Sequence, residues 1–244
     1  MFSLKDKRIL VTGASSGIGR QIAIDIANQG GIVTLLGRNL DRLKEVINEL
    51  GGIGHQSFSV ELTLQSELEE FVKLQQPFDG VLLNAGIIDY VPVKFINTEK
   101  LDAIFNTNFK AAVILSQLLL KKKLVNKSGA FVFISSISSK LGVPGTALYA
   151  ASKAALSSYS KVLASELAGQ KIRSNCICPG IIVTPMTKAA IEASPEAISE
   201  GEKHYPLGYG EPKDVSGIAI YLLSDESKWM TGTDLILDGG LTLK

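Results

Sequence analysis

Short apolar runs alternate with amphipathic segments along most of the chain. The apolar runs have the length of buried strands, and the segments between them repeat apolar residues at helical spacing. Strands are predicted at residues 8–11, 32–36, 55–60, 80–83, 130–134, 174–178 and 234–237. Helices are predicted around residues 22–27 and over 40–50, 66–74, 101–124, 149–167 and 215–223. This alternation predicts an α/β fold, a doubly wound parallel sheet with helices on both faces.

The chain contains no linker, internal repeat or low-complexity tract that would divide it. We therefore expect residues 1–244 to form a single domain, a common length for one α/β core. One segment, residues 184–210, is rich in small and polar residues and carries two prolines. We expect this segment to be a mobile loop over the substrate.

The composition excludes several classes of function. Apolar residues make up 45% of the chain, charged residues 20%, and the net charge is +1, which gives no footprint for nucleic acid or an anionic membrane. No hydrophobic signal core opens the chain and no apolar run approaches membrane-spanning length, so we expect a cytoplasmic protein.

His55 and His204 lack metal-ligand spacing, so no metal site is expected. Cys176 and Cys178 lie two apart in a strand and are expected to be buried free thiols.

A glycine-rich turn joins the first predicted strand to the first helix. Its sequence is Thr12-Gly13-Ala14-Ser15-Ser16-Gly17-Ile18-Gly19. Such a turn directs backbone N–H groups and a helix N-terminus at an anion, the usual position of a dinucleotide pyrophosphate. The spacing is neither the general G-x-G-x-x-G motif nor a P-loop. The alternative is a tight turn that needs glycine only for packing.

Tyr149 and Lys153 are four residues apart in a predicted helix, and Ser136 precedes Tyr149 by 13 residues. Residues i and i+4 share a helix face, so the phenol and the ammonium are neighbours. A phenol titrates near pH 10, and a nearby cation favours its ionised form. The pair is therefore a candidate proton donor and its activator, with a surface tyrosine packed on a lysine stem as the alternative.

These residues, with others further along, resemble the short-chain dehydrogenase/reductase family. The matching motifs, in the order and spacing of that family, are Thr12-Gly13-x-x-x-Gly17-x-Gly19, Asn84-Ala85-Gly86, Asn108, Ser136, Tyr149/Lys153 and Pro179-Gly180. Within the family the chain looks most like the 3-oxoacyl-[acyl-carrier-protein] reductase-like enzymes. The resemblance implies a Rossmann-type domain, a nicotinamide dinucleotide, and hydride transfer between a carbonyl and a secondary alcohol.

The resemblance also implies a role for each site residue. Ser136 orients the substrate carbonyl, Tyr149 transfers the proton, Lys153 lowers the phenol pKa and binds the nicotinamide ribose, and Asn108 holds a water that relays protons. The implied cofactor-binding residues are Gly13, Ser15, Ser16, Gly17, Ile18, Gly19, Arg38, Glu61, Leu62, Asn84, Ala85, Gly86, Tyr149, Lys153, Pro179, Gly180, Ile182 and Thr184. Glu61 stands where the family commonly has an aspartate, and Leu83 replaces the first asparagine of the usual Asn-Asn-Ala-Gly.

The end of the second predicted strand indicates which cofactor is preferred. NAD-preferring relatives carry an acidic residue there, whereas this chain has Gly37 followed by Arg38. A guanidinium can hold the 2′-phosphate of NADP(H), which a carboxylate would repel. Ser15 is a second potential donor to that phosphate. NADP(H) is therefore favoured over NAD(H), unless Arg38 only pairs with Asp41 or Glu45 on the next helix.

The sequence leaves the substrate open. The residues expected to line its pocket are Ile87, Ile88, Tyr90, Leu141, Val143 and the segment from Met186 to Tyr205. They are mostly apolar, so a small carbonyl or alcohol substrate is expected, either linked to acyl carrier protein or free. Lys127 and Lys171 are candidates for basic residues at the rim that would contact a carrier protein, and isolated surface lysines are the equally expected alternative. The alternatives are a ketone, steroid or sugar-type alcohol dehydrogenase, or a non-catalytic cofactor-binding regulator. Relatives suggest a homo-oligomer, a tetramer or dimer.

Overall fold

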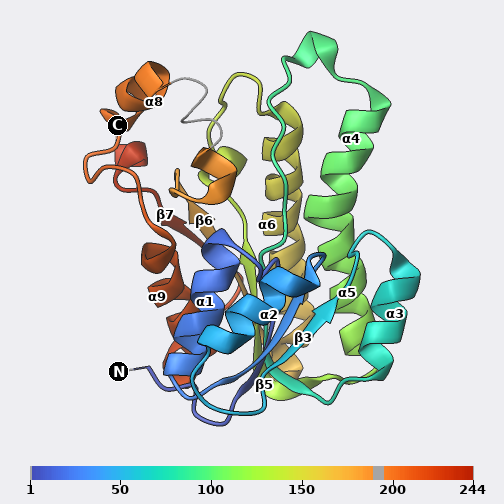
Figure 1. Cartoon of the computed structure of the whole chain (residues 1–244). Helices are drawn as coiled ribbons and strands as arrows, with labels where there is room; N and C mark the ends of the chain where they lie inside the picture. The colour runs from blue at the N-terminus through green and yellow to red at the C-terminus, as the bar shows by residue number, and fades with distance from the viewer. Residues whose placement is uncertain (1, 189–194, 244) are drawn as a thin grey trace.

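The chain folds around one parallel sheet, seen in a computed structural model that describes residues 2–188 and 195–243 (Figure 1). The strands are β1 (Arg8–Thr12), β2 (Ile32–Gly37), β3 (Gln56–Ser59), β4 (Phe78–Leu83), β5 (Val125–Ile134), β6 (Arg173–Pro179) and β7 (Asp234–Leu237). All neighbouring strands pair in parallel, in the order β3-β2-β1-β4-β5-β6-β7. The predicted doubly wound α/β fold is confirmed.

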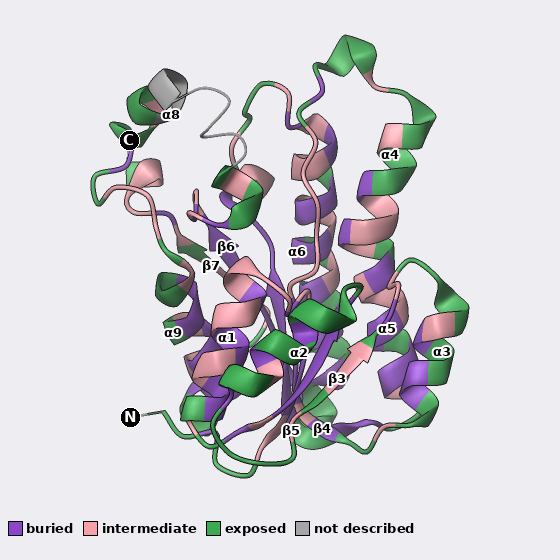
Figure 2. Ribbon diagram, viewed as in Figure 1, coloured by how far each residue is buried: buried purple, intermediate pink, exposed green. Residues whose placement is uncertain are grey.

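Helices cover both faces of this sheet. They are α1 (Gly17–Asn28), α2 (Leu40–Glu49), α3 (Gln65–Lys73), α4 (Thr98–Phe105), α5 (Ala111–Lys121), α6 (Ala147–Leu167), α8 (Pro195–Glu202) and α9 (Pro212–Leu223). Helices α1, α2 and α9 pack on one face, and α3, α5 and α6 pack on the other. Figure 2 shows the buried residues concentrated between these helices and the strands.

Alternation along each strand sends side chains into two separate cores. In β1, Ile9 and Val11 face the helices α1, α2 and α9, whereas Leu10 faces α3, α5 and α6. Both positions are buried because both faces of the sheet are covered, which is why the strands read as continuous apolar runs. Cys176 and Cys178 lie on the same face as buried free thiols, as predicted.

The predicted long helix over residues 101–124 differs from the structure at its centre. Helix α4 passes into a π-helical turn, Asn106–Lys110, before continuing as α5. A π turn adds a residue to the helical repeat and thereby changes which side chains face inward. Asn108, within this turn, is fully buried.

The same helix bears on the expectation that no apolar run approaches membrane-spanning length. Among the described residues, Thr98–Lys121 is long and apolar enough to cross a membrane, with a mean hydropathy of 1.3. The helix is not an uninterrupted apolar run, because charged residues such as Glu99, Asp102 and Lys110 lie within it, and length and composition alone do not separate a core helix from a membrane span. In this fold the helix packs against α3 and α6, and 39% of its most apolar window is buried.

The segment expected to form a substrate loop, residues 184–210, contains regular structure. Residues 185–188 are helical, and α8 occupies Pro195–Glu202. The part of the expected loop at residues 189–194 lies outside the described residues.

Candidate active site

A cleft of about 550 Å³ opens at the carboxyl ends of the strands. Ligands bind at this edge of open parallel sheets, where the strand order reverses, here between β1 and β4. Nearly all predicted site residues line the cleft, namely Gly13, Ser15, Ser16, Gly17, Ile18, Arg38, Glu61, Leu62, Asn84, Ala85, Gly86, Ser136, Tyr149, Lys153, Pro179, Gly180, Ile182 and Thr184. Two predicted residues, Gly19 and Asn108, lie behind its wall.

The glycine turn between β1 and α1 has a backbone that only glycine adopts easily. Gly13 has φ +63° and Gly17 has φ +54°. Ser16, the N-cap of α1, makes no capping hydrogen bond with its side chain, so the first N–H groups of the helix keep their hydrogen-bonding capacity for a ligand. The turn therefore has the geometry of a phosphate site.

Gly19 contributes through packing and does not line the cleft. A Cβ at this position would overlap the Gly13 carbonyl oxygen and lie 2.5 Å from Asn84 Nδ2. Asn84 uses that amide to donate to the carbonyls of Thr12 and Gly13, at 3.2 and 3.1 Å. Gly19 thus lets α1, the glycine turn and the end of β4 approach each other closely.

We expect Gly19→Ala to lower the stability of the fold by roughly 1–3 kcal/mol, because the methyl group overpacks a rigid backbone contact. Binding of a nicotinamide cofactor should weaken with it, since the glycine turn must move. Thermal unfolding and a cofactor titration measure the two effects. Gly217→Ala is the matched control, since a Cβ on this exposed glycine of α9 meets no atom within 4 Å. If the two variants behave alike, the packing role of Gly19 is wrong.

Ser136, Tyr149 and Lys153 converge at the other end of the cleft. Ser136 follows β5 and hydrogen-bonds to Tyr149, and its Oγ also accepts from the Ser138 backbone N–H at 3.1 Å. Lys153 lies one turn after Tyr149 on α6, with Nζ 5.7 Å from the centre of the phenol ring. The ammonium donates to the Ile134 carbonyl at 2.8 Å and is 3% exposed. The serine, phenol and ammonium are thus placed for a proton transfer.

Burial is the largest cause of the pKa shifts of Tyr149 and Lys153. It raises the pKa of Tyr149 above its usual value, and the hydrogen bond from Ser136 offsets only part of that change. Burial also lowers the pKa of Lys153 to about 8. Lys153 is not among the groups that shift the pKa of Tyr149 here, so its expected lowering of the phenol pKa stays a prediction.

Asn108 supports the site from behind. Its Nδ2 donates to the Ile87 carbonyl at 2.9 Å and to Ser152 Oγ at 3.1 Å, while its Oδ1 accepts from the Ile87 N–H at 2.8 Å. Both donors are used, and one lone pair of Oδ1 is left. Asn108 Oδ1 and Lys153 Nζ each lie 3.3 Å from the position of a Cβ on Gly86, so these two groups flank the same glycine.

One end of the cleft, where the adenosine is expected and which is called the adenosine end below, lies where β2 and β3 finish. Gly37, Arg38, Asn39, Arg42 and Glu61 line it. Arg38 does not pair with Asp41 or Glu45. Its Nη1 instead lies 4.0 Å from Glu61 Oε2, and its side chain is 75% exposed. Glu61 also accepts from the backbone N–H and the hydroxyl of Thr63.

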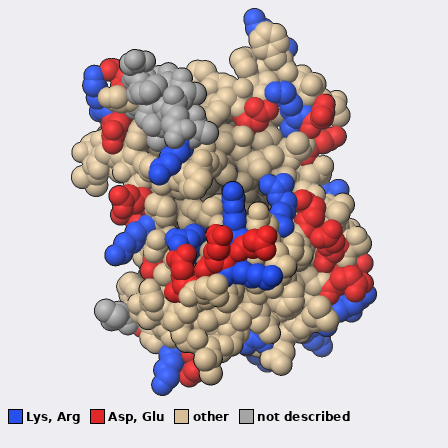
Figure 3. Space-filling view, viewed as in Figure 1, with Lys and Arg blue, Asp and Glu red and all other residues tan. Residues whose placement is uncertain are grey.

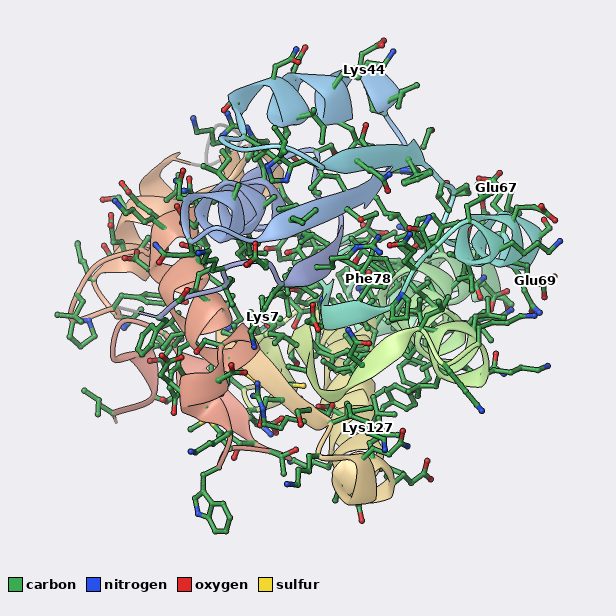
Figure 4. The ribbon with its side chains drawn as sticks, turned by 90° about the horizontal axis from the view of Figure 1, so that it is seen from below. Lys7, Lys44, Glu67, Glu69, Phe78 and Lys127 are labelled. Atoms are coloured by element: carbon green, nitrogen blue, oxygen red, sulfur yellow. The ribbon has the colours of Figure 1, made fainter. Side chains whose placement is uncertain are left out.

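The opposite end, where the substrate is expected and which is called the substrate end below, is lined by residues that include Ile87, Ile88, Tyr90, Leu141, Val143, Met186 and Tyr205. Lys127 and Lys171 are not at its rim. They precede or begin strands β5 and β6, whose opposite ends border the cleft, and Figure 4 shows Lys127 at the base of the molecule. The prediction that they border this chain's own active site is wrong.

Figure 3 shows acidic and basic side chains mixed over the face that it displays.

Sequence reasoning missed three kinds of supporting residue. Thr12 Oγ1 accepts from the N–H groups of Asn84 and Ala85 and so ties β1 to the end of β4. Ser135 donates to the Lys153 carbonyl at 2.9 Å, and Ser152 donates to the Tyr149 carbonyl at 2.7 Å. Thr12, Ser135 and Ser152 each stand next to a predicted site residue in the sequence, and this position could have indicated their role. Arg42, four residues after Arg38, had no motif to reveal it.

Comparisons with known proteins agree with this fold and site. The family model described as Enoyl-(Acyl carrier protein) reductase matches residues 13–242. The 3-oxoacyl-[acyl-carrier-protein] reductase of Thermotoga maritima is 34% identical, covering 98% of this chain and 99% of its own. D-erythrulose reductase of Gallus gallus is 32% identical, covering 98% and 96%. A structure from Beutenbergia cavernae, provisionally assigned as an NAD(P) dependent gluconate 5-dehydrogenase and solved with bound NADP at low occupancy, has a TM-score of 0.91 and 34% identity, covering 100% and 99%.

The fold and the cleft define a nucleotide-binding oxidoreductase. The chain belongs to the short-chain dehydrogenase/reductase family, as its sequence resemblance indicated. It is an NAD(P)-dependent enzyme that interconverts a CH–OH group and a carbonyl.

The residues of the cleft fit a nicotinamide dinucleotide. A Cβ on Gly13 would lie 2.9 Å from the Ala85 Cα, and one on Gly86 would crowd Lys153 and Asn108, so glycine at both positions lets these segments lie close together along the cleft wall. The uncapped start of α1 suits the pyrophosphate, and the buried ammonium of Lys153 suits ribose hydroxyls.

Proposed function

We propose that this enzyme is an NADP(H)-dependent reductase of an uncharged carbonyl compound, with a 3-oxoacyl thioester as the first candidate substrate. The observation that carries the cofactor choice is the end of β2, where Gly37 and Arg38 stand in place of a carboxylate. The apolar lining of the substrate end supports an acyl substrate, and the similarity to 3-oxoacyl-[acyl-carrier-protein] reductases agrees with it.

In this mechanism the Ser136 hydroxyl donates a hydrogen bond to the substrate carbonyl oxygen and fixes its position. Tyr149 then gives its phenol proton to the same oxygen, and its raised pKa keeps that proton available at neutral pH. The nicotinamide, when bound, supplies the hydride that the carbonyl carbon receives. Lys153 holds the ribose hydroxyls and stabilises the phenolate left on Tyr149. The free lone pair of Asn108 Oδ1 is the acceptor for a water that returns the proton.

The substrate end favours neutral over anionic substrates. Among the described residues that line that end, Lys153 is the one cation, since Arg38 and Arg42 lie at the adenosine end. A sugar acid such as gluconate carries a carboxylate that has no guanidinium to pair with there. Neutral ketones, steroids and sugar-type alcohols remain the alternative substrates.

A substrate screen that follows NADPH absorbance tests this proposal. We expect acetoacetyl thioesters to be reduced with higher kcat/KM than cyclic or steroidal ketones, and 5-ketogluconate to be a poor substrate. Efficient turnover of the sugar acid, with no turnover of thioesters, would contradict it. A non-catalytic regulator is disfavoured because Ser136, Tyr149 and Lys153 are all placed for proton transfer, and it would show cofactor binding without turnover.

Arg38 is expected to select the 2′-phosphate. A single bidentate arginine contributes about 1.5–3 kcal/mol, so Arg38→Ala should weaken NADPH by roughly ten- to a hundredfold and leave NADH nearly unchanged. Gly37→Asp combined with Arg38→Ala should reverse the preference, because the carboxylate also repels the phosphate. Fluorescence titration of both cofactors measures the change. Equal affinity of the unaltered enzyme for NADH and NADPH would show the NADP assignment to be wrong.

We also propose that the enzyme is a single-domain, cytoplasmic homo-oligomer in which residues 184–188 and 195–210 move over the substrate. The exposed part of the apolar helix Thr98–Lys121 supports a partner subunit on that face. Light scattering of the purified protein distinguishes a monomer from a dimer or tetramer.

A further inference from the structure

A second arginine, Arg42, lines the adenosine end of the cleft. Arg42 is the third residue of α2 and lines the cleft together with Arg38 and Asn39. Its backbone N–H is bound by Asn39 Oδ1 at 2.9 Å, which fixes the start of the helix. The cation on Arg42 is therefore carried by the rigid first turn of α2, whereas Arg38 sits in the loop before it.

The two guanidinium groups differ in what surrounds them. Arg38 Nη1 lies 4.0 Å from the Glu61 carboxylate, so part of its charge is already balanced. Within the described residues, no carboxylate makes an ion pair with Arg42. The other nearby cations are not available: Arg20 pairs with Glu49, and Lys44 does not line the cleft and points outward from α2 (Figure 4).

This arrangement sets a condition on phosphate binding. A 2′-phosphate held by Arg38 would also approach Glu61, and two anions at short range repel each other strongly when partly shielded from water. One arginine shared with a carboxylate is a weak basis for selecting a dianion. A second guanidinium without an ion-pair partner, on the same edge of the cleft, would offset the repulsion by Glu61. Two guanidinium groups, each donating two hydrogen bonds, can together bind all three phosphate oxygens.

We infer that Arg42 is a second specificity-determining residue for the cofactor and binds the 2′-phosphate together with Arg38. This inference rests on the proposed preference for NADP(H). Arg42 supplies the unpaired charge, and Arg38 is drawn from Glu61 to the phosphate when the cofactor binds. The N-terminus of α2 is not itself the anion site, since Asn39 already occupies the N–H of Arg42.

Binding measurements without turnover test the assignment. The probes are NADPH, NADH, 2′,5′-ADP and 5′-AMP, titrated calorimetrically into the unaltered enzyme, Arg42→Ala, Arg38→Ala and the double variant. We expect Arg42→Ala to weaken NADPH and 2′,5′-ADP by about tenfold, with NADH and 5′-AMP changed less than about twofold. The double variant should bind NADPH and NADH equally. Lys44→Ala is the matched control, a cation lost from the same helix outside the cleft, and should change none of the four affinities.

The outcomes separate this inference from the proposed function. If Arg38→Ala weakens NADPH while Arg42→Ala behaves like Lys44→Ala, the role of Arg42 is wrong and the NADP(H) preference stands. If the unaltered enzyme binds NADPH no better than NADH, the proposed preference itself fails. If Arg42→Ala weakens all four probes equally, Arg42 holds the adenosine in general and does not select the phosphate. Arg42 is exposed, so thermal unfolding without cofactor should match the unaltered enzyme and exclude a folding defect.

Discussion

Tyr149→Phe should reduce turnover by about 10²–10⁴-fold, because it removes the one proton that the site can hand to the carbonyl oxygen. The ring keeps its shape and its place on α6 beside Lys153, so the cleft itself should not change. Affinity for NADPH should stay within about twofold of the unaltered enzyme, since the phenol hydroxyl adds at most one of many cofactor contacts. Steady-state kinetics and a cofactor titration on the same preparation measure both quantities.

Tyr90→Phe provides the control for this experiment. Tyr90 also lines the cleft, but its side chain is 59% exposed and it makes no hydrogen bond to Ser136 in the described part of the chain. Loss of the Tyr90 hydroxyl should change turnover only a few-fold. Comparable activity in Tyr149→Phe and the unaltered enzyme would rule out Tyr149 as the proton donor.

The sequence predicted the sheet well because the sheet is covered on both sides. Residues 81–83 of β4 and 130–134 of β5 are buried on both faces of the sheet, so they appear as short continuous apolar runs that are hard to mistake. The motifs then fell into one cleft without further information, because the carboxyl ends of parallel strands meet at one edge. Gly13, Ser136 and Pro179 are far apart in sequence, yet each follows or ends a strand and lines the same cleft.

What the sequence did not predict depends on contacts between distant segments. The π turn around Asn108 has no local signal, because it is stabilised by hydrogen bonds to Ile87 and Ser152 from two other segments. The pairing of Arg38 with Glu61 joins the ends of β2 and β3, whereas sequence proximity had suggested Asp41 or Glu45. Lys127 is a different case, because it precedes the predicted strand at residues 130–134 and the parallel sheet already placed it opposite the carboxyl ends of the strands.

The protonation of Lys153 links the structure to the pH dependence of the reaction. Burial lowers the pKa of this lysine to about 8, so its charge is largely present at pH 7 and is lost as the pH rises through that value. In the reduction direction, kcat/KM reports the free enzyme and should fall above about pH 8 as the ammonium is lost. In the oxidation direction Tyr149 must first lose its proton, so the rate should rise with pH until loss of the Lys153 charge opposes the increase.

Lys153→Met should lower kcat in both directions by about 10²-fold or more, because a charge aimed at the developing phenolate is removed from a dry site. Methionine conserves most of the side-chain volume, so the loss of rate would come from the missing charge and not from a cavity in the protein. Without the ammonium, the pKa of Tyr149 should rise further, and the oxidation profile should move to higher pH. Cofactor affinity should fall as well, through lost contacts to the ribose, which a titration with NADPH measures. An oxidation profile that coincides with that of the unaltered enzyme, together with unchanged NADPH affinity, would mean that Lys153 only fills space and satisfies the Ile134 carbonyl.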